Sequence, residues 1–159
     1  MAEKDSVVEI QVAEMFAGLV PVERLERAVM VTLEREERPG EVTVVITDDE
    51  GIRELNRDFM GEDEATDVLS FPSQEDGGPF IAAPGSDDYL GDVVISYARA
   101  VTQAFEQEHP VERELDLLVV HGVLHVLGMD HADADEAAAM QAVERELLAR
   151  FAATGRVST

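Results

Sequence analysis

The chain contains no cysteine and no tryptophan, and its only lysine is Lys4. Without cysteine there is neither a disulfide framework nor a thiolate metal site. No apolar run reaches the ~18–20 residues that a membrane-spanning helix requires. Residues 1–12 also lack the basic and apolar regions of a signal peptide. From these absences we expect a cytoplasmic protein with no membrane partner.

Positive charge is scarce as well, with 12 basic residues against 35 acidic ones and a formal net charge of −23. Such a surface repels nucleic acid unless basic groups gather locally, because phosphate contacts supply much of the affinity. The acidic excess is typical of a well-solvated, soluble surface. It would equally suit a face that binds a basic partner protein.

The length of 159 residues fits one domain, which we expect to span residues 1–159. Alternating and β-branched segments predict four strands, and apolar residues at helical spacing predict about five helices. The fold class is therefore α+β. The expected strands are Ser6–Ala13, Glu41–Asp48, Thr66–Pro72 and Leu90–Ser96. The helices begin at Pro21, after a cap at Asp49, after the fourth strand, at Pro110 and at Asp133, and residues 74–88 are expected to be a loop.

Three of the four histidines fall within HGVLHVLGMDH, residues 121–131. On a helix, His121 and His125 lie one turn apart and project from one face. Gly128 then ends the helix with a left-handed residue, so that His131 can fold back from the following loop. Three neutral imidazoles leave a fourth position for water, which is typical of a catalytic zinc site. We expect one Zn²⁺ per chain at His121, His125 and His131, although three imidazoles also suit nickel, iron or cobalt.

The surroundings of these histidines narrow the chemistry. A zinc peptidase with an HExxH motif carries a glutamate beside the first histidine, whereas this chain has Gly122 there. Water would then depend on the metal to lower its pKa toward ~7, and the hydroxide could attack a phosphodiester. Asp130 fits either a role in orienting a ligand or an ordinary turn. We interpret His109 as a structural residue.

The motif HGVLHVLGMDH resembles the H-G-x-L-H-L-x-G-Y-D-H signature of the YbeY family. Two further segments, TDVLSFP and LGDVVIS, resemble strands of that family and occur in the same order, so the resemblance covers about Glu41 to Phe151. It implies a mixed four-stranded sheet, with zinc at the three histidines on a central helix and its following loop. It also implies a zinc-dependent, single-strand-specific endoribonuclease of 16S ribosomal RNA 3′ end maturation and ribosome quality control. Single-stranded ribosomal RNA, the small ribosomal subunit and its basic proteins are then the expected partners.

The sequence departs from the family pattern at one position of the expected cleft. Met60 stands where the family has an arginine, a natural clamp for phosphate. Arg57 or Arg53, on the same predicted helix, is a candidate replacement. Ser70 and Thr66 are candidate substrate contacts, and ordinary strand packing would explain both equally well.

Two other functions fit parts of the sequence. Met60, the missing glutamate and the acidic surface suit a ribosome-assembly binding factor whose metal is mainly structural. The spacing H-x3-H-x2-G-x2-H is also that of a metzincin-like peptidase, but Gly122 removes the general base that such an enzyme requires.

Overall fold

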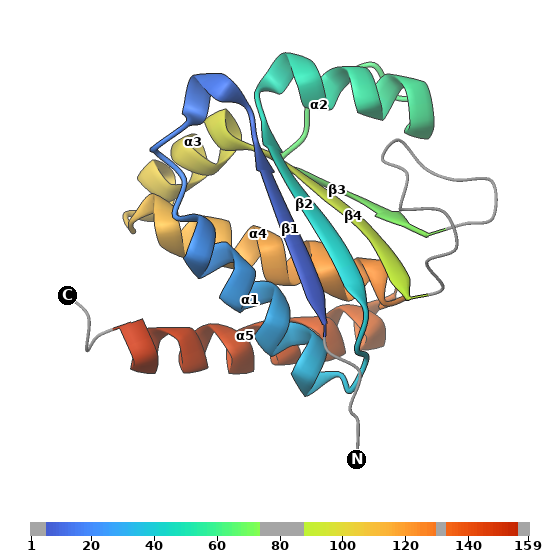
Figure 1. Cartoon of the computed structure of the whole chain (residues 1–159), viewed down its shortest axis with the longest axis vertical. Helices are drawn as coiled ribbons and strands as arrows, with labels where there is room; N and C mark the ends of the chain where they lie inside the picture. The colour runs from blue at the N-terminus through green and yellow to red at the C-terminus, as the bar shows by residue number, and fades with distance from the viewer. Residues whose placement is uncertain (1–5, 74–87, 130–132, 156–159) are drawn as a thin grey trace.

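Three of the four strands run parallel and the fourth runs against them. The computed structural model describes residues 6–73, 88–129 and 133–155. Its strands β1 (Val7–Val12), β2 (Glu41–Thr47), β3 (Val68–Pro72) and β4 (Tyr89–Ser96) form one sheet in the order β1-β2-β4-β3 (Figure 1). β2 pairs in parallel with β1 and β4, while β3 pairs antiparallel with β4 at the edge. The predicted α+β class and mixed four-stranded sheet are confirmed, and most of the expected loop at 74–88 lies outside the described residues.

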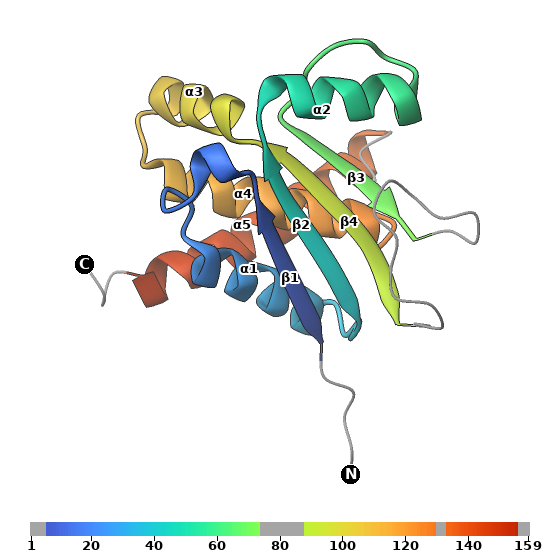
Figure 2. The same cartoon turned by 45° about the horizontal axis from the view of Figure 1, so that its top comes forward.

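Five α-helices occur in the described part of the chain, as the sequence predicted. They are α1 (Val22–Arg35), α2 (Asp49–Leu55), α3 (Tyr97–Gln107), α4 (Val111–Val126) and α5 (Ala134–Gly155). A short 3₁₀ turn, η1 (Glu14–Phe16), follows β1, and a π-helical turn, η2 (Asn56–Met60), continues α2. α1 and α4 pack on one face of the sheet, α5 packs on α4 beyond them, and α2 lies toward the other face (Figures 1 and 2).

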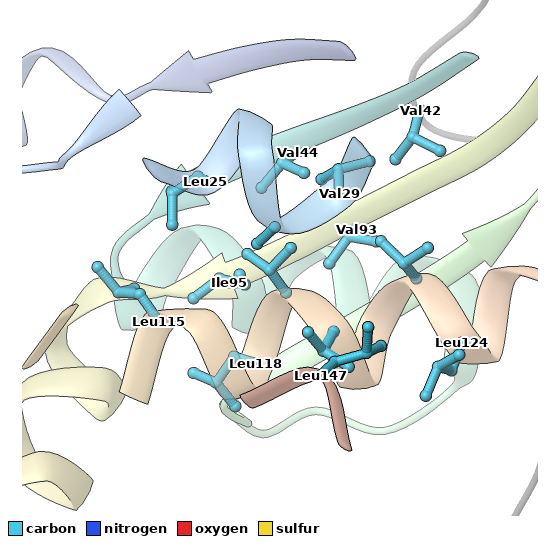
Figure 3. Packing of buried hydrophobic residues seen from close by; sticks show 14 of the residues in the cluster. Leu25, Val29, Val42, Val44, Val93, Ile95, Leu115, Leu118, Leu124 and Leu147 are labelled. Carbon is cyan, nitrogen blue, oxygen red and sulfur yellow. The ribbon is translucent and has the colours of Figure 1, made fainter. Parts of the chain in front are cut away.

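The core lies between the sheet and α4. Alternate residues of β2 and β4 point toward α1 and α4 because successive side chains of a strand face opposite sides. α4 is buried on most of its circumference, and α5 contributes the apolar stripe that its helical spacing predicts. Figure 3 shows these side chains interdigitating, among them Val44, Val93, Ile95, Leu115, Leu118, Leu124 and Leu147. Burying a side chain of this size stabilises the fold by roughly 1.5–3 kcal/mol, so α4 is held firmly at its place on the sheet.

The N-terminus of α2 differs from the sequence prediction by one residue. Asp48 caps the helix: its backbone is extended, and its Oδ1 accepts a hydrogen bond from the Gly51 amide at 2.7 Å. Asp49, predicted as the cap, lies inside the first turn and accepts a hydrogen bond from Ser96 Oγ at 2.7 Å. The prediction was wrong because two adjacent aspartates offer the same capping oxygen, and the end of β2 decides which one is extended.

The N-terminus of α5 agrees with its prediction, since the Glu136 amide donates to Asp133 Oδ1 at 2.8 Å. Within the residues that the structure describes, no helix is both long and apolar enough to cross a bilayer.

Candidate metal and substrate site

α4 brings two of the three predicted ligands together. His121 and His125 lie one helical turn apart, with ring centroids separated by 4.7 Å and ring planes inclined by 69°. Both side chains are partly exposed, whereas most other residues of α4 are buried. The i, i+4 spacing therefore puts two imidazoles side by side at a surface that a small ligand can reach.

The end of α4 has the glycine geometry that the sequence predicted. Gly128 has φ +105°, its amide donates to His125 O at 3.0 Å, and the Met129 amide donates to Leu124 O at 3.0 Å. This pair of bonds is a Schellman motif, which reverses the chain directly after a helix. A Cβ on Gly128 would touch nothing within 4 Å, so its backbone conformation is what favours glycine. Asp130 and His131 lie just beyond, outside the described residues.

The two histidines open onto a cavity of about 390 Å³ whose other wall is the edge strand. The lining residues are Thr66, Asp67, Val68, Leu69, Ser70, Pro72, His121 and His125. Thr66 and Ser70, the predicted substrate contacts, therefore share one cavity with the histidine pair. Segments about fifty residues apart in the sequence meet here because α4 packs across β3 and β4.

Arg53 and Arg57, the candidate replacements for the family arginine, do not line the cavity. Arg57 Nε lies 3.0 Å from Asp58 Oδ1, and Arg53 Nε lies 2.8 Å from Asp63 Oδ1. Both pairs are well exposed, and neither arginine belongs to the cavity lining given above. Met60 ends η2 with 44% of its surface exposed. Within the described residues, the cavity wall thus carries two imidazoles and the Asp67 carboxylate but no guanidinium.

Close packing explains why position 122 is a glycine, which the sequence did not reveal. A Cβ at this position would lie 2.4 Å from Val93 Cγ1, because this side of α4 presses on the sheet. The carbonyl oxygen of Gly122 accepts a hydrogen bond from Ser70 Oγ at 2.9 Å, which ties β3 to the histidine helix. A glutamate side chain therefore cannot fit at position 122. This packing excludes the general base that the peptidase interpretation requires.

The outer edge of β3 carries hydrogen-bonding groups along the cavity. Asp67 O accepts from Ser96 N at 2.9 Å and Ser73 N donates to Leu90 O at 2.9 Å, so the odd-numbered residues face β4. In an antiparallel pair the intervening residues then direct their N–H and C=O groups outward. The Val68 amide is capped by Asp67 Oδ1 at 2.8 Å and Pro72 has no N–H, which leaves the Ser70 amide as an outward donor.

Glu144 is a site residue that the sequence analysis missed. Its Oε2 lies 2.6 Å from His121 Nδ1, and its side chain is only 12% exposed. It belongs to α5, one residue beyond Val143 of the buried stripe. A carboxylate adjoining an apolar stripe was the available signal, but only the packing of α5 on α4 identifies its partner.

His109 has a different partner, as its interpretation as a structural residue requires. Its Nε2 lies 2.8 Å from Oε1 of the buried Glu114, at the turn between α3 and α4.

Asp92, in the LGDVVIS segment, lies on the sheet face opposite the histidines. It is 2% exposed, and the Tyr89 hydroxyl donates to its Oδ1 while lying 2.9 Å from Thr43 Oγ1. Burial raises the pKa of Asp92 to about 6 and is also the main cause that raises the pKa of Tyr89. Desolvation penalises the charged carboxylate more than the tyrosine hydrogen bond stabilises it.

The described residues fit part of a metal centre. No three of their histidine, aspartate or glutamate side chains are grouped to hold an ion, and His131 is outside them. Two adjacent imidazoles, one backed by a carboxylate, are nevertheless the donors that zinc and its neighbours prefer. An α+β domain with two adjacent imidazoles in a cavity beside an edge strand has the kind of site that metal-dependent hydrolases use.

Comparison with known proteins identifies the family within that class. The sequence model described as Endoribonuclease YbeY matches residues 9–152. This chain is 46% identical over 152 residues to an endoribonuclease YbeY of Roseiflexus sp. (strain RS-1), covering 93% of this chain and 94% of the relative. It is 44% identical to the one of Chloroflexus aurantiacus (strain J-10-fl), covering 89% and 92%. The chain belongs to the endoribonuclease YbeY family, as its motifs predicted.

A solved structure agrees with the fold. The solution structure of a Thermotoga maritima protein superposes with a TM-score of 0.67 at 25% identity, covering 96% of this chain and 93% of that one.

Proposed function

We propose that this protein is a zinc-dependent endoribonuclease that cleaves single-stranded RNA, with the 3′ end of precursor 16S ribosomal RNA as its substrate. The observation that carries the proposal is the pairing of His121 and His125 in one cavity with the edge of β3. Membership of an endoribonuclease family supports the RNA substrate. The maturation step and the role in ribosome quality control are what the family resemblance of the three motifs implies, and the cytoplasmic location is the expectation drawn from the sequence.

The histidines would hold the metal, with His121 and His125 contributed by α4 and His131 by the sequence that follows it. A bound zinc ion supplies Lewis acidity, which lowers the pKa of water and stabilises charge that develops on phosphate oxygens. The apolar packing around α4 fixes the helix that carries the two imidazoles before any ligand arrives, which reduces the reorganisation needed for binding.

The edge strand would hold the RNA. The Ser70 amide can donate a hydrogen bond to a phosphate oxygen, as backbone amides do in many nucleic-acid complexes. The Thr66 hydroxyl donates to Asp67 Oδ1 at 3.4 Å and would turn from it to do the same. An extended single strand can follow the edge of β3 and reach the histidines, whereas the backbone of a duplex is held away by its paired strand. Single-strand specificity is then a consequence of the shape of this wall.

The charge of the chain bears on its partners. Because the net charge is −23 and Arg53 and Arg57 are paired with aspartates, long-range attraction contributes little to RNA binding. We infer that the acidic surface instead contacts basic proteins of the small ribosomal subunit, which would deliver the RNA to the cleft.

Cleavage of a labelled single-stranded fragment spanning the 16S 3′ end tests the proposal. We expect cleavage by the zinc-loaded protein, loss with a chelator and recovery on adding zinc. His121→Ala and His125→Ala should each lose at least ~100-fold in rate. His109→Gln is the matched control, because it changes a histidine outside the cavity and keeps a donor for Glu114. Cleavage that persists in both alanine variants, once contaminating nucleases are excluded, contradicts the proposal.

A ribosome-assembly factor without catalysis is the second candidate, favoured by the absence of a guanidinium from the described cavity wall. Under this alternative, His125→Ala would still co-sediment with small subunits and would restore growth to a strain lacking the protein. Restoration of growth only by the cleavage-competent protein excludes it.

A further inference from the structure

We infer that Glu144 is a positioning residue, which holds His121 in the tautomer and orientation that bind the metal. The inference rests on the proposed metal site and deepens it by adding a residue from a different helix. It begins with the 2.6 Å contact between Glu144 Oε2 and His121 Nδ1.

The contact fixes the protonation of the neutral imidazole. A carboxylate is an acceptor, so His121 Nδ1 must carry the hydrogen, and Nε2 is then the nitrogen that can present a lone pair to an ion. In water, neutral imidazole populates both tautomers and its ring rotates freely. Glu144 removes that freedom for His121 before binding, and its negative charge makes the ring a stronger donor.

The surroundings of Glu144 make this contact stronger than an ordinary surface pair. Its side chain is 12% exposed and that of His121 is 29% exposed, so water screens the contact only in part. Glu144 follows Val143 and lies one helical turn after Met140, both buried in the interface of α5 with the rest of the core. Since α5 is anchored by this stripe, the carboxylate is held against His121 by the fold.

A second glutamate on the same helix provides a matched comparison. Glu146 pairs with Arg35 of α1 at 2.9 Å, with its side chain 47% exposed. Glu144 and Glu146 both bridge α5 to another helix, but only Glu144 contacts a predicted metal ligand. A general effect of losing a carboxylate from α5 would therefore appear on substitution of either glutamate. An effect on the position of His121 would appear only on substitution of Glu144.

Zinc affinity measured by competition with a chromophoric chelator tests the inference without any RNA. Removal of a carboxylate behind a ligating histidine usually weakens metal binding 10- to 100-fold. We expect about 100-fold weaker zinc binding for Glu144→Ala. Glu144→Gln should lose about 10-fold, because its amide oxygen still accepts from Nδ1 but carries no charge. Glu146→Gln should stay within about twofold of the unaltered protein.

The tautomer of His121 in the metal-free protein is a second readout, obtained from the ¹⁵N chemical shifts of its ring. We expect the Nδ1–H form in the unaltered protein and in Glu144→Gln, and a mixture in Glu144→Ala. Unchanged zinc affinity and an unchanged tautomer in Glu144→Ala would overturn the inference. Failure of the RNA assay alone would count against the proposed function and leave this result intact, since neither readout uses RNA.

Discussion

The hydroxyl of Ser70 and the carbonyl oxygen of Gly122 lie 2.9 Å apart and form a hydrogen bond. Through this contact the edge strand is fixed to the helix that carries both described histidines. The distance between β3, the proposed RNA-binding strand, and the two histidines is therefore set by the fold and does not depend on the substrate.

Substitutions at Ser70 separate its hydroxyl from its amide. Ser70→Ala should lower the free energy of unfolding by about 0.5–1.5 kcal/mol, the net contribution of one hydrogen bond, and leave RNA affinity nearly unchanged. Ser70→Pro also removes the outward N–H. An edge strand tolerates proline at such a position, as Pro72 of β3 shows. We expect a further loss of several-fold in RNA affinity, measured by fluorescence anisotropy. Equal affinity in the two variants would show that the amide does not contact RNA.

Gly122→Ala tests the close packing of α4 on the sheet. Alanine favours helices over glycine by about 1 kcal/mol, but its Cβ would lie 2.4 Å from Val93 Cγ1 in the middle of β4. Overpacking of this kind costs about 1–3 kcal/mol, and we expect net destabilisation in urea unfolding. The double variant Gly122→Ala/Val93→Ala should lose less free energy of unfolding than the sum of the losses in the two single variants. Strict additivity would mean that the two positions are not in contact.

Asp92→Asn should stabilise the protein at pH 8. The pKa of Asp92 is about 6 in the folded protein and 3.8 in the unfolded chain. The stability that comes from keeping this carboxyl neutral in the fold is therefore fully present below pH 3.8. That contribution is lost as the pH rises through 6, at a cost on the order of 2–3 kcal/mol. Asparagine keeps an acceptor for Tyr89 and carries no charge. The stability difference between variant and unaltered protein should therefore shrink as the pH falls from 8 to 4 in urea titrations.

The control for this pH dependence is Asp135→Asn, which changes an exposed aspartate of α5. A stability difference for Asp92→Asn that did not vary with pH would contradict burial of the charged group.

Met60→Arg should restore a cation at the position where the family has one. Met60 is exposed at the end of η2, and its neighbour Phe59 packs against Phe71 of β3 with ring centroids 5.7 Å apart. One added phosphate contact should steepen the dependence of RNA affinity on salt by about one unit in the log–log plot. Gln107→Arg adds the same charge on the exposed surface of α3. Equal steepening in both variants would indicate a general charge effect.

Much of the fold was predictable because its signals are local. Alternating apolar residues gave the strands, helical spacing gave the buried stripe of α5, and Gly128 gave the left-handed end of α4. The adjacency of His121 and His125 also follows from local geometry, since residues four apart share a helix face. The cap of α2 shows where this reasoning fails, because Asp48 and Asp49 are chemically identical and only the exit of β2 from the sheet selects between them.

The sequence by itself determined the family, the mixed α+β class and the presence of two imidazoles on one helix face, because each depends on residues close together or on ordered motifs. Only the tertiary structure decided that Glu144 stands behind His121, that Gly122 is required by Val93, and that the Ser70 hydroxyl bonds to the Gly122 carbonyl. These relationships join segments between 23 and 52 residues apart. They depend on how α4 packs between the sheet and α5, and no local pattern of residues encodes that packing.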